Sequence, residues 1–158
     1  MTLEEEVGSL LRSSGRSLAV AESCTGGLIG HRITNVAGSS AYFLLGVVSY
    51  SNEAKQGVLG VREETLASHG AVSTQTAEEM ALGVRRLAGT DVAISTTGIA
   101  GPGGGSAEKP VGSVCVGLAW EGGVWSERFE LGRDRDRAEI KQATADLALR
   151  RLLAWLEE

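Results

Sequence analysis

Three apolar, β-rich runs of this chain are each followed by a segment whose residues could act in catalysis or binding. This repeated order of strand and polar segment limits the possible folds more than any other feature. The segments are Glu22–Gly27, Tyr50–Lys55 and Thr97–Gly105. The first two run directly into helical patterns, as strand-to-helix turns do. In an open α/β sheet such turns converge on one crevice, where ligands bind. The sequence therefore predicts that a serine, a tyrosine, a lysine and a glycine-rich loop meet at one edge of a sheet.

Helical and strand periods alternate along the whole chain. We expect helices over 2–14, 25–36, 52–59, 62–68, 74–87 and 134–156, and strands over 17–22, 42–50, 91–97, 111–120 and 124–131. Helices between strands imply parallel pairing, whereas the tight turn at 121–123 makes the last two strands antiparallel. The prediction is a three-layer α/β/α sandwich with a mixed, mostly parallel five-stranded sheet and one antiparallel hairpin strand. With 158 residues, one domain over 1–158 is expected.

Composition narrows the class of protein. The net charge is −5 without a basic run, so direct nucleic-acid binding is not expected. No apolar stretch approaches the roughly 20 residues that span a bilayer, and two cysteines fit a reducing, cytoplasmic location without a disulfide framework. The two histidines and two cysteines show no ligand spacing, so neither a metal nor another cofactor is expected.

Ser23 is the candidate nucleophile, because it follows the first strand. The backbone N–H groups of Thr25, Gly26 and Gly27 would begin the next helix, and such donors suit a phosphate or a developing oxyanion. The alternative is that Ser23 or Thr25 only caps the helix. The segment lacks the Gly-x-Ser-x-Gly elbow of α/β-hydrolases. Cys24 is a rival nucleophile, although a buried structural cysteine is the commoner case.

Tyr50 and Lys55 offer the base that a serine nucleophile needs. Both histidines fall within or at the end of predicted helices, so lysine is the candidate, provided that burial lowers its pKa. The tyrosine hydroxyl would relay or orient the proton. The alternative is that Tyr50 packs at the sheet edge and Lys55 is solvated, as most lysines are.

The glycine-rich loop over 98–105 matches neither the phosphate-binding loop of nucleotide hydrolases nor the dinucleotide fingerprint. Its amides could still surround an anion, with Lys109 nearby for charge. Arg133, Arg135 and Arg137 stand where the last helix opens, an end at which positive charge opposes the helix dipole. They could serve an anionic ligand, although solvated charge is the default.

Five strings, at 21–27, 38–43, 50–55, 59–61 and 98–104, together resemble the CinA C-terminal domain family, over about residues 3–155. That family contains nicotinamide-nucleotide amidases. The resemblance implies hydrolysis of the carboxamide of nicotinamide mononucleotide to nicotinate mononucleotide and ammonia. It also implies a catalytic set that falls on Ser23, Tyr50 and Lys55, and an acyl-enzyme formed after Lys55 takes the proton of Ser23. A non-catalytic module that binds or senses a mononucleotide is the alternative.

Substrate contacts are predicted at Thr25, Gly26, Gly27, Ser40, Asn52, Thr97, Gly98, Gly101 and Arg137. The segment 131–137 is longer than the usual Gly-Asp-Arg of the family, so the arginine that faces the ligand could instead be Arg135 or Arg133. The expected partners are the pyridine nucleotide and a second copy of the chain. The homodimer is suggested by the exposed hairpin and by the resemblance.

Overall fold

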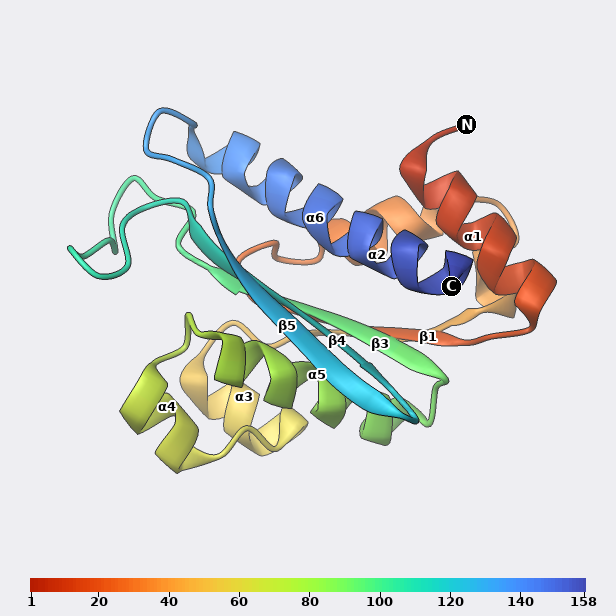
Figure 1. Ribbon diagram of the computed structural model, residues 1–158, viewed down its shortest axis with the longest axis horizontal. Coiled ribbons are helices and arrows are strands. Elements are labelled where there is room, and N and C mark those ends of the chain that lie inside the picture. The colour runs from red at the N-terminus through yellow and green to blue at the C-terminus, as the bar shows by residue number, and fades with distance from the viewer.

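The computed structural model describes residues 1–158 and has three layers built around a five-stranded sheet in the order β2-β1-β3-β4-β5 (Figure 1). The strands are β1 (Leu18–Glu22), β2 (Phe43–Val48), β3 (Val92–Gly98), β4 (Ser113–Trp120) and β5 (Gly123–Glu130). β1 pairs in parallel with β2 and β3, whereas β4 is antiparallel to both β3 and β5. Only β4 runs against the other strands, which confirms the predicted mixed sheet.

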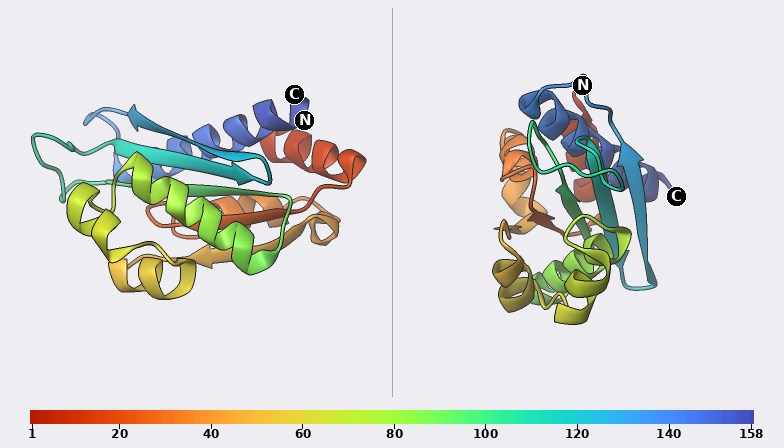
Figure 2. Two further views of the ribbon diagram at one scale, coloured as in Figure 1. Left: turned by 60° about the horizontal axis from the view of Figure 1, so that its bottom comes forward. Right: turned by 90° about the vertical axis from the view of Figure 1, so that its left-hand side faces the viewer.

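Helices cover both faces of the sheet, as the two further views show (Figure 2). One face carries α1 (Leu3–Ser14), α2 (Leu28–Thr34) and α6 (Arg137–Glu157), and the other carries α3 (Asn52–Leu59), α4 (Glu63–His69) and α5 (Thr74–Ala88). The short 3-10 helix η1 (Ser39–Ala41) precedes β2. None of the helices has both the length and the apolar composition that crossing a membrane requires.

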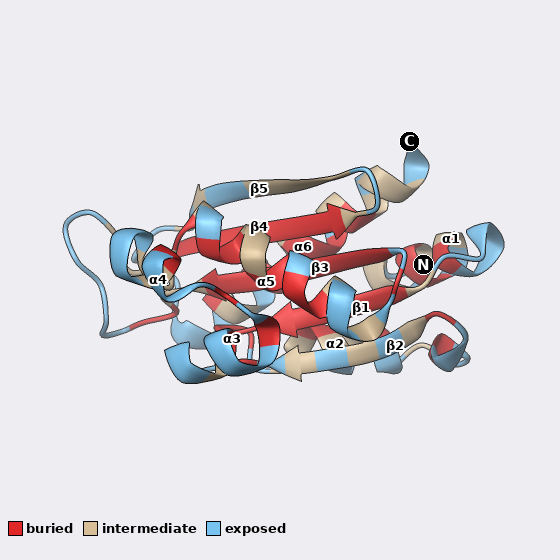
Figure 3. Ribbon diagram, turned by 90° about the horizontal axis from the view of Figure 1, so that it is seen from below, coloured by how far each residue is buried: buried red, intermediate tan, exposed pale blue.

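Two hydrophobic cores lie on the two faces of the sheet. Leu18 and Val20 belong to the larger core, which includes residues of α1 and α6, and Ala19 and Ala21 alternate with them into the core beside α5. This alternation along one strand explains why β1 is buried throughout its length. Figure 3 shows the same burial in β3 and β4, while β2 and β5 form the more exposed rims.

Capping residues fix where the helices begin. α6 begins at Arg137 rather than Asp134, because Asp136 accepts from Glu139 N (2.8 Å) and completes a capping box. α3 begins at Asn52, as predicted, and is capped by Ser51, whose hydroxyl accepts from Ala54 N (3.0 Å). The arginine segment before α6 is therefore an exposed loop, which places Arg133 and Arg135 outside the helix.

α2 begins later than predicted, at Leu28 instead of Thr25. Gly26 and Gly27 have φ values of +59° and +101°, in the left-handed region that glycine enters most readily. The chain between β1 and α2 is thus a turn over 23–27 that reverses direction before the helix starts. The N–H groups of this turn therefore do not belong to the first turn of a helix. They are not the helix-end donors that the sequence predicts for the site.

Candidate active site

Ser23 and Lys55 meet at the carboxyl edge of the sheet, as the sequence predicts for two adjacent parallel strands. Lys55 Nζ donates to Ser23 Oγ at 3.0 Å, and both residues are buried, with 7% and 1% of their surface exposed. Ser23 directly follows β1, and Lys55 lies in the first turn of α3, which follows β2. The alternative of a solvated lysine is therefore wrong.

The Lys55 ammonium lies in surroundings that favour its neutral form. It has no carboxylate partner, and its other two hydrogen bonds go to the backbone carbonyls of Ser49 (3.0 Å) and Tyr50 (3.2 Å). Burial lowers the pKa of Lys55. A neutral amine keeps two N–H groups for the two carbonyls and turns its lone pair to the Ser23 hydroxyl. The geometry thus fits a general base as well as a donor.

Tyr50 takes a different place from the expected proton relay. Its side chain is 62% exposed, and its hydroxyl accepts from Arg137 Nη2 (3.1 Å), with no hydrogen bond to Ser23 or Lys55. Only its backbone carbonyl contacts the Lys55 ammonium. The side chain points outward because the chain leaves the sheet after Ser49, so the phenol lies at the mouth of the site.

A buried carboxylate holds the turn that carries Ser23. The Glu22 carboxylate accepts from Thr25 Oγ1 (2.6 Å) and from the first-turn amides of α2, Ile29 N (2.9 Å) and Gly30 N (3.0 Å). It replaces a side-chain cap, since Gly27 at the N-cap has none. The start of α2 therefore binds a residue of the protein itself and is not free for a substrate anion.

Three of the predicted substrate contacts lie away from the cavities in this arrangement. Thr25 is fully buried, and its hydroxyl also meets Thr96 Oγ1 (2.8 Å), so it faces the interior. Gly26 and Gly27 line neither of the two cavities described below. The residue of this turn that does line the cavity beside Ser23 is Cys24.

The cavity beside Ser23 has a volume of about 260 Å³. Five of the predicted contacts line it, namely Asn52, Thr97, Gly98, Gly101 and Arg137. The hydroxyl of Thr97 donates to Ala71 O (2.8 Å), so Thr97 holds the neighbouring 70–73 loop as well. Ser40 is not in the cavity: it is exposed in η1, before β2, and residues before a parallel strand lie at the edge opposite to residues after it.

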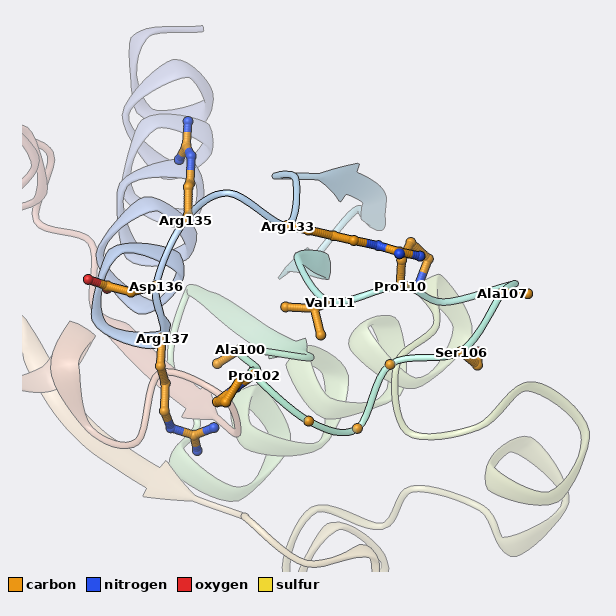
Figure 4. A pocket seen from close by; sticks show the side chains of 13 residues that line it. Ala100, Pro102, Ser106, Ala107, Pro110, Val111, Arg133, Arg135, Asp136 and Arg137 are labelled. Carbon is orange, nitrogen blue, oxygen red and sulfur yellow. The ribbon is translucent and has the colours of Figure 1, made fainter.

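A second, larger cavity of about 890 Å³ adjoins the first, with which it shares Ala100, Gly103, Gly104 and Arg137. It lies between the glycine-rich loop and the segment before α6 (Figure 4). The N–H groups of Ala100, Gly101, Gly103 and Gly104 donate to no acceptor within the protein. The larger cavity does not contain Ser23, so the serine–lysine pair belongs to the smaller one, and the larger one extends it toward solvent.

Arg137 stands where the two cavities join. Its guanidinium donates to Gly101 O (2.7 Å) and to the Tyr50 hydroxyl, and it has no carboxylate partner. Arg133 and Arg135 line only the larger cavity, and in Figure 4 Arg133 points along the loop toward Pro110 while Arg135 points in the opposite direction to Arg137. Of the three candidate arginines, Arg137 is thus the one that lines the cavity of Ser23.

Cys24 is poorly suited to the role of nucleophile. Burial raises the pKa of its thiol to about 12, so it remains a thiol at neutral pH. No hydrogen bond joins it to a base, whereas the adjacent Ser23 has the Lys55 amine.

Some residues of the site were missed by the sequence interpretation. Ala71 and Val72 line the cavity from the loop before α5, and no motif or composition in that loop could have indicated them. The role of Glu22 did have a signal, since it is the one charged residue in an otherwise apolar strand. A charge there requires a partner, and that need could have pointed to the turn and α2.

Fold and site together define an α/β domain with a buried serine–lysine pair at the carboxyl edge of its sheet. The sequence model of the CinA C-terminal domain matches residues 1–156, and the chain belongs to that family. It is 64% identical to a CinA-like protein of Chloroherpeton thalassium over 82% of this chain and 31% of that protein. It is 52% identical to a CinA-like protein of Chlorobium limicola over 99% of this chain and 37% of that protein. The chain thus spans about a third of the length of these curated relatives.

Solved structures agree with the family assignment. The chain is similar to the competence/damage inducible protein CihA of Agrobacterium tumefaciens, with a TM-score of 0.92, 44% identity, and coverage of 99% of this chain and 96% of the other. It is also similar to the competence damage-inducible protein A of Klebsiella pneumoniae, with a TM-score of 0.94, 38% identity, and the same coverage. These likenesses confirm the fold and extend over nearly all of both chains.

Proposed function

We propose that the chain is an amidase that hydrolyses the carboxamide of nicotinamide mononucleotide to nicotinate mononucleotide and ammonia. The observation that carries this proposal is the buried amine of Lys55, without a carboxylate partner, 3.0 Å from the Ser23 hydroxyl. Serine paired with a lysine of lowered pKa is a known means of cleaving an amide without a metal. The resemblance of the motifs to the family's amidases supplies the substrate.

The reaction follows from the chemistry of the pair. Neutral Lys55 takes the proton of Ser23 as its oxygen bonds to the carboxamide carbon. The Cys24 N–H, next to the nucleophile, is the donor that we assign to the oxyanion, because Cys24 lines the cavity. The C–N bond then breaks, the Lys55 ammonium gives its proton to the departing ammonia, and an ester remains on Ser23. Water, deprotonated by Lys55, cleaves that ester and releases the carboxylate.

In this proposal the two adjoining cavities bind the pyridine ring, the ribose and the phosphate of the mononucleotide. The small cavity takes the pyridine ring, with Tyr50 at its mouth. The phosphate lies toward the larger cavity, where Arg137 and the unengaged amides of Gly101, Gly103 and Gly104 supply donors. Charge-assisted hydrogen bonds from a guanidinium suit a phosphate. Asn52 and Thr97 remain predicted contacts along the ribose.

The test is ammonia release from nicotinamide mononucleotide by the unmutated protein and by Ser23→Ala, with folding checked by circular dichroism. We expect release by the unmutated protein only, and substrate binding by both. Release that persists in Ser23→Ala would place the nucleophile on another group and overturn the mechanism. Binding without release, even by the unmutated protein, would support a module that senses the mononucleotide.

A further inference from the structure

Glu22 is the only buried acidic residue of the chain, with 2% of its surface exposed, and it directly precedes Ser23. Its carboxylate accepts from Thr25 Oγ1 (2.6 Å) and from the amides of Ile29 (2.9 Å) and Gly30 (3.0 Å). Burying a charge is costly unless hydrogen bonds satisfy it. The proposed reaction gives this carboxylate no task, so its place beside the nucleophile calls for an explanation.

Capping of α2 explains only two of the three contacts. The first amides of the helix need an acceptor, which Gly27 at the N-cap lacks, and the Glu22 carboxylate supplies it. Thr25 precedes the helix, yet its contact with the carboxylate is the shortest. A hydroxyl has one hydrogen, and Thr25 donates it to Glu22, so Thr25 accepts from the Thr96 hydroxyl at 2.8 Å. A directed chain of buried hydrogen bonds therefore runs from β3 through the turn to β1.

This chain of hydrogen bonds surrounds the two groups that the proposed reaction uses. The Thr96 carbonyl accepts from Ser23 N (3.0 Å), and the Ser23 carbonyl accepts from Gly26 N (3.1 Å). The N–H of Cys24, between Ser23 and Thr25, donates to no acceptor within the protein. Only one residue separates Thr25 from Ser23, so a displacement of Thr25 would move both the Cys24 N–H and the Ser23 hydroxyl.

We propose that Glu22 is a positioning residue of the reaction, which acts through Thr25 to hold the Ser23 hydroxyl and the Cys24 N–H in the geometry of attack. This assignment rests on the proposed function. Glu22 lines neither cavity and forms no ion pair with Lys55, so it acts by position and not as the counter-ion of the base. The nucleophile and the start of α2 thus share one anchor, and a small displacement of reacting groups is enough to slow a reaction.

The proposal is tested first by the kcat and KM of Glu22→Gln and Glu79→Gln. Glu79 is the matched control, because its carboxylate also accepts from an amide, Arg62 N (2.8 Å), and from a threonine hydroxyl, Thr65 Oγ1 (2.5 Å), and it lines neither cavity. Glutamine has one acceptor oxygen where the carboxylate has two. We expect kcat to fall about 10–100-fold in Glu22→Gln at nearly unchanged KM, and to change little in the control. An unchanged kcat in Glu22→Gln, or an equal fall in both variants, would overturn the proposal.

The route through Thr25 is tested by Thr25→Val and Thr25→Ser, which also serve if circular dichroism shows that Glu22→Gln does not fold. Valine keeps the branched shape without the hydroxyl, whereas serine keeps the hydroxyl. We expect Thr25→Val to lower kcat about as much as Glu22→Gln, and Thr25→Ser to keep most of it. Because both residues act through one contact, the losses of Glu22→Gln and Thr25→Val should not add in the double variant. Equal kcat values for Thr25→Val and Thr25→Ser would contradict this route.

Two further measurements distinguish positioning from an effect on the base and from a failure of the proposed function. The pH profile of kcat/KM should keep its shape in Glu22→Gln, and a shifted profile would mean that Glu22 acts on the charge of Lys55 instead. Hydrogen exchange of the Ser23 and Gly26 amides, followed by NMR, needs no substrate and should be faster in Glu22→Gln than in the unmutated protein. If the unmutated protein releases no ammonia, the proposed function fails, whereas unchanged exchange would refute the hold of Glu22 on the turn.

Discussion

The Ser23–Lys55 pair and the glycine-rich loop with Arg137 border the same cavity, yet the chain builds them in opposite ways. The pair is buried, and every hydrogen bond of the amine goes to a fixed group at the end of β1 or β2. The loop is exposed from Pro102 onward, and five of its amides have no acceptor, those of Ala100, Gly101, Gly103, Gly104 and Gly105. The groups proposed to transfer the proton are thus held in place by the protein itself, whereas the donors proposed to bind the anion still have free hydrogen-bonding capacity.

The difference follows from the cost of each arrangement. A buried amine without a counter-ion is costly, and it keeps one position only where the surrounding backbone is fixed by the sheet. Exposed guanidinium groups and loop amides remain solvated at little cost until an anion displaces water. The comparison predicts that changes to the pair affect the rate, and that changes to the loop affect binding.

The largest effect is expected from Lys55→Met, which removes the amine and keeps the length of an unbranched side chain. We expect kcat to fall by about 10²–10⁴-fold, because loss of a general base typically costs that much. Calorimetric affinity for nicotinamide mononucleotide should remain close to that of the unmutated protein. Lys141→Met, on α6 and outside both cavities, is the control and should keep the activity. If Lys55→Met lost affinity by the same factor as it lost kcat, the prediction that the pair affects the rate and the loop affects binding would be wrong.

A smaller effect, on binding, is expected from Arg137→Ala. Hydrogen bonds to a charged group contribute about 1.5–3 kcal/mol, so KM should rise about 10–100-fold while kcat changes little. Arg150→Ala, which removes an exposed arginine of α6 outside both cavities, is the matched control, and its KM should stay nearly unchanged. If kcat falls in Arg137→Ala at unchanged KM, this arginine acts on the chemistry through Tyr50 instead.

The elements that follow from local periodicity were predictable from the sequence, and so was the meeting of Ser23 with Lys55. Parallel strands joined by helices bring their carboxyl ends together, so two residues after adjacent strands must be neighbours. The start of α2 was missed because a helix period cannot show the positive φ of Gly26 and Gly27, nor a cap supplied by Glu22 from another element.

Contacts between remote segments were beyond sequence reasoning. The bond from Arg137 to the Tyr50 hydroxyl joins residues 87 positions apart, and it depends on how two exposed loops fold back. Ser40 was placed in the site because a motif orders residues along the chain and not in space. The strand between Ser40 and Tyr50 separates them within one subunit.

The smallest expected effect is a pH dependence of stability that should exist for the pair and be absent from the loop. Because burial lowers the folded pKa of Lys55, the unfolded chain binds more protons between that pKa and the ordinary value for lysine. The free energy of unfolding should therefore rise with pH through this window, relative to Lys55→Met, by at most about 1.4 kcal/mol per pH unit. Urea unfolding over this range measures it, and Arg137→Ala should follow the unmutated protein. A difference that falls with pH would mean that folding raises the pKa of Lys55, which would remove the neutral base.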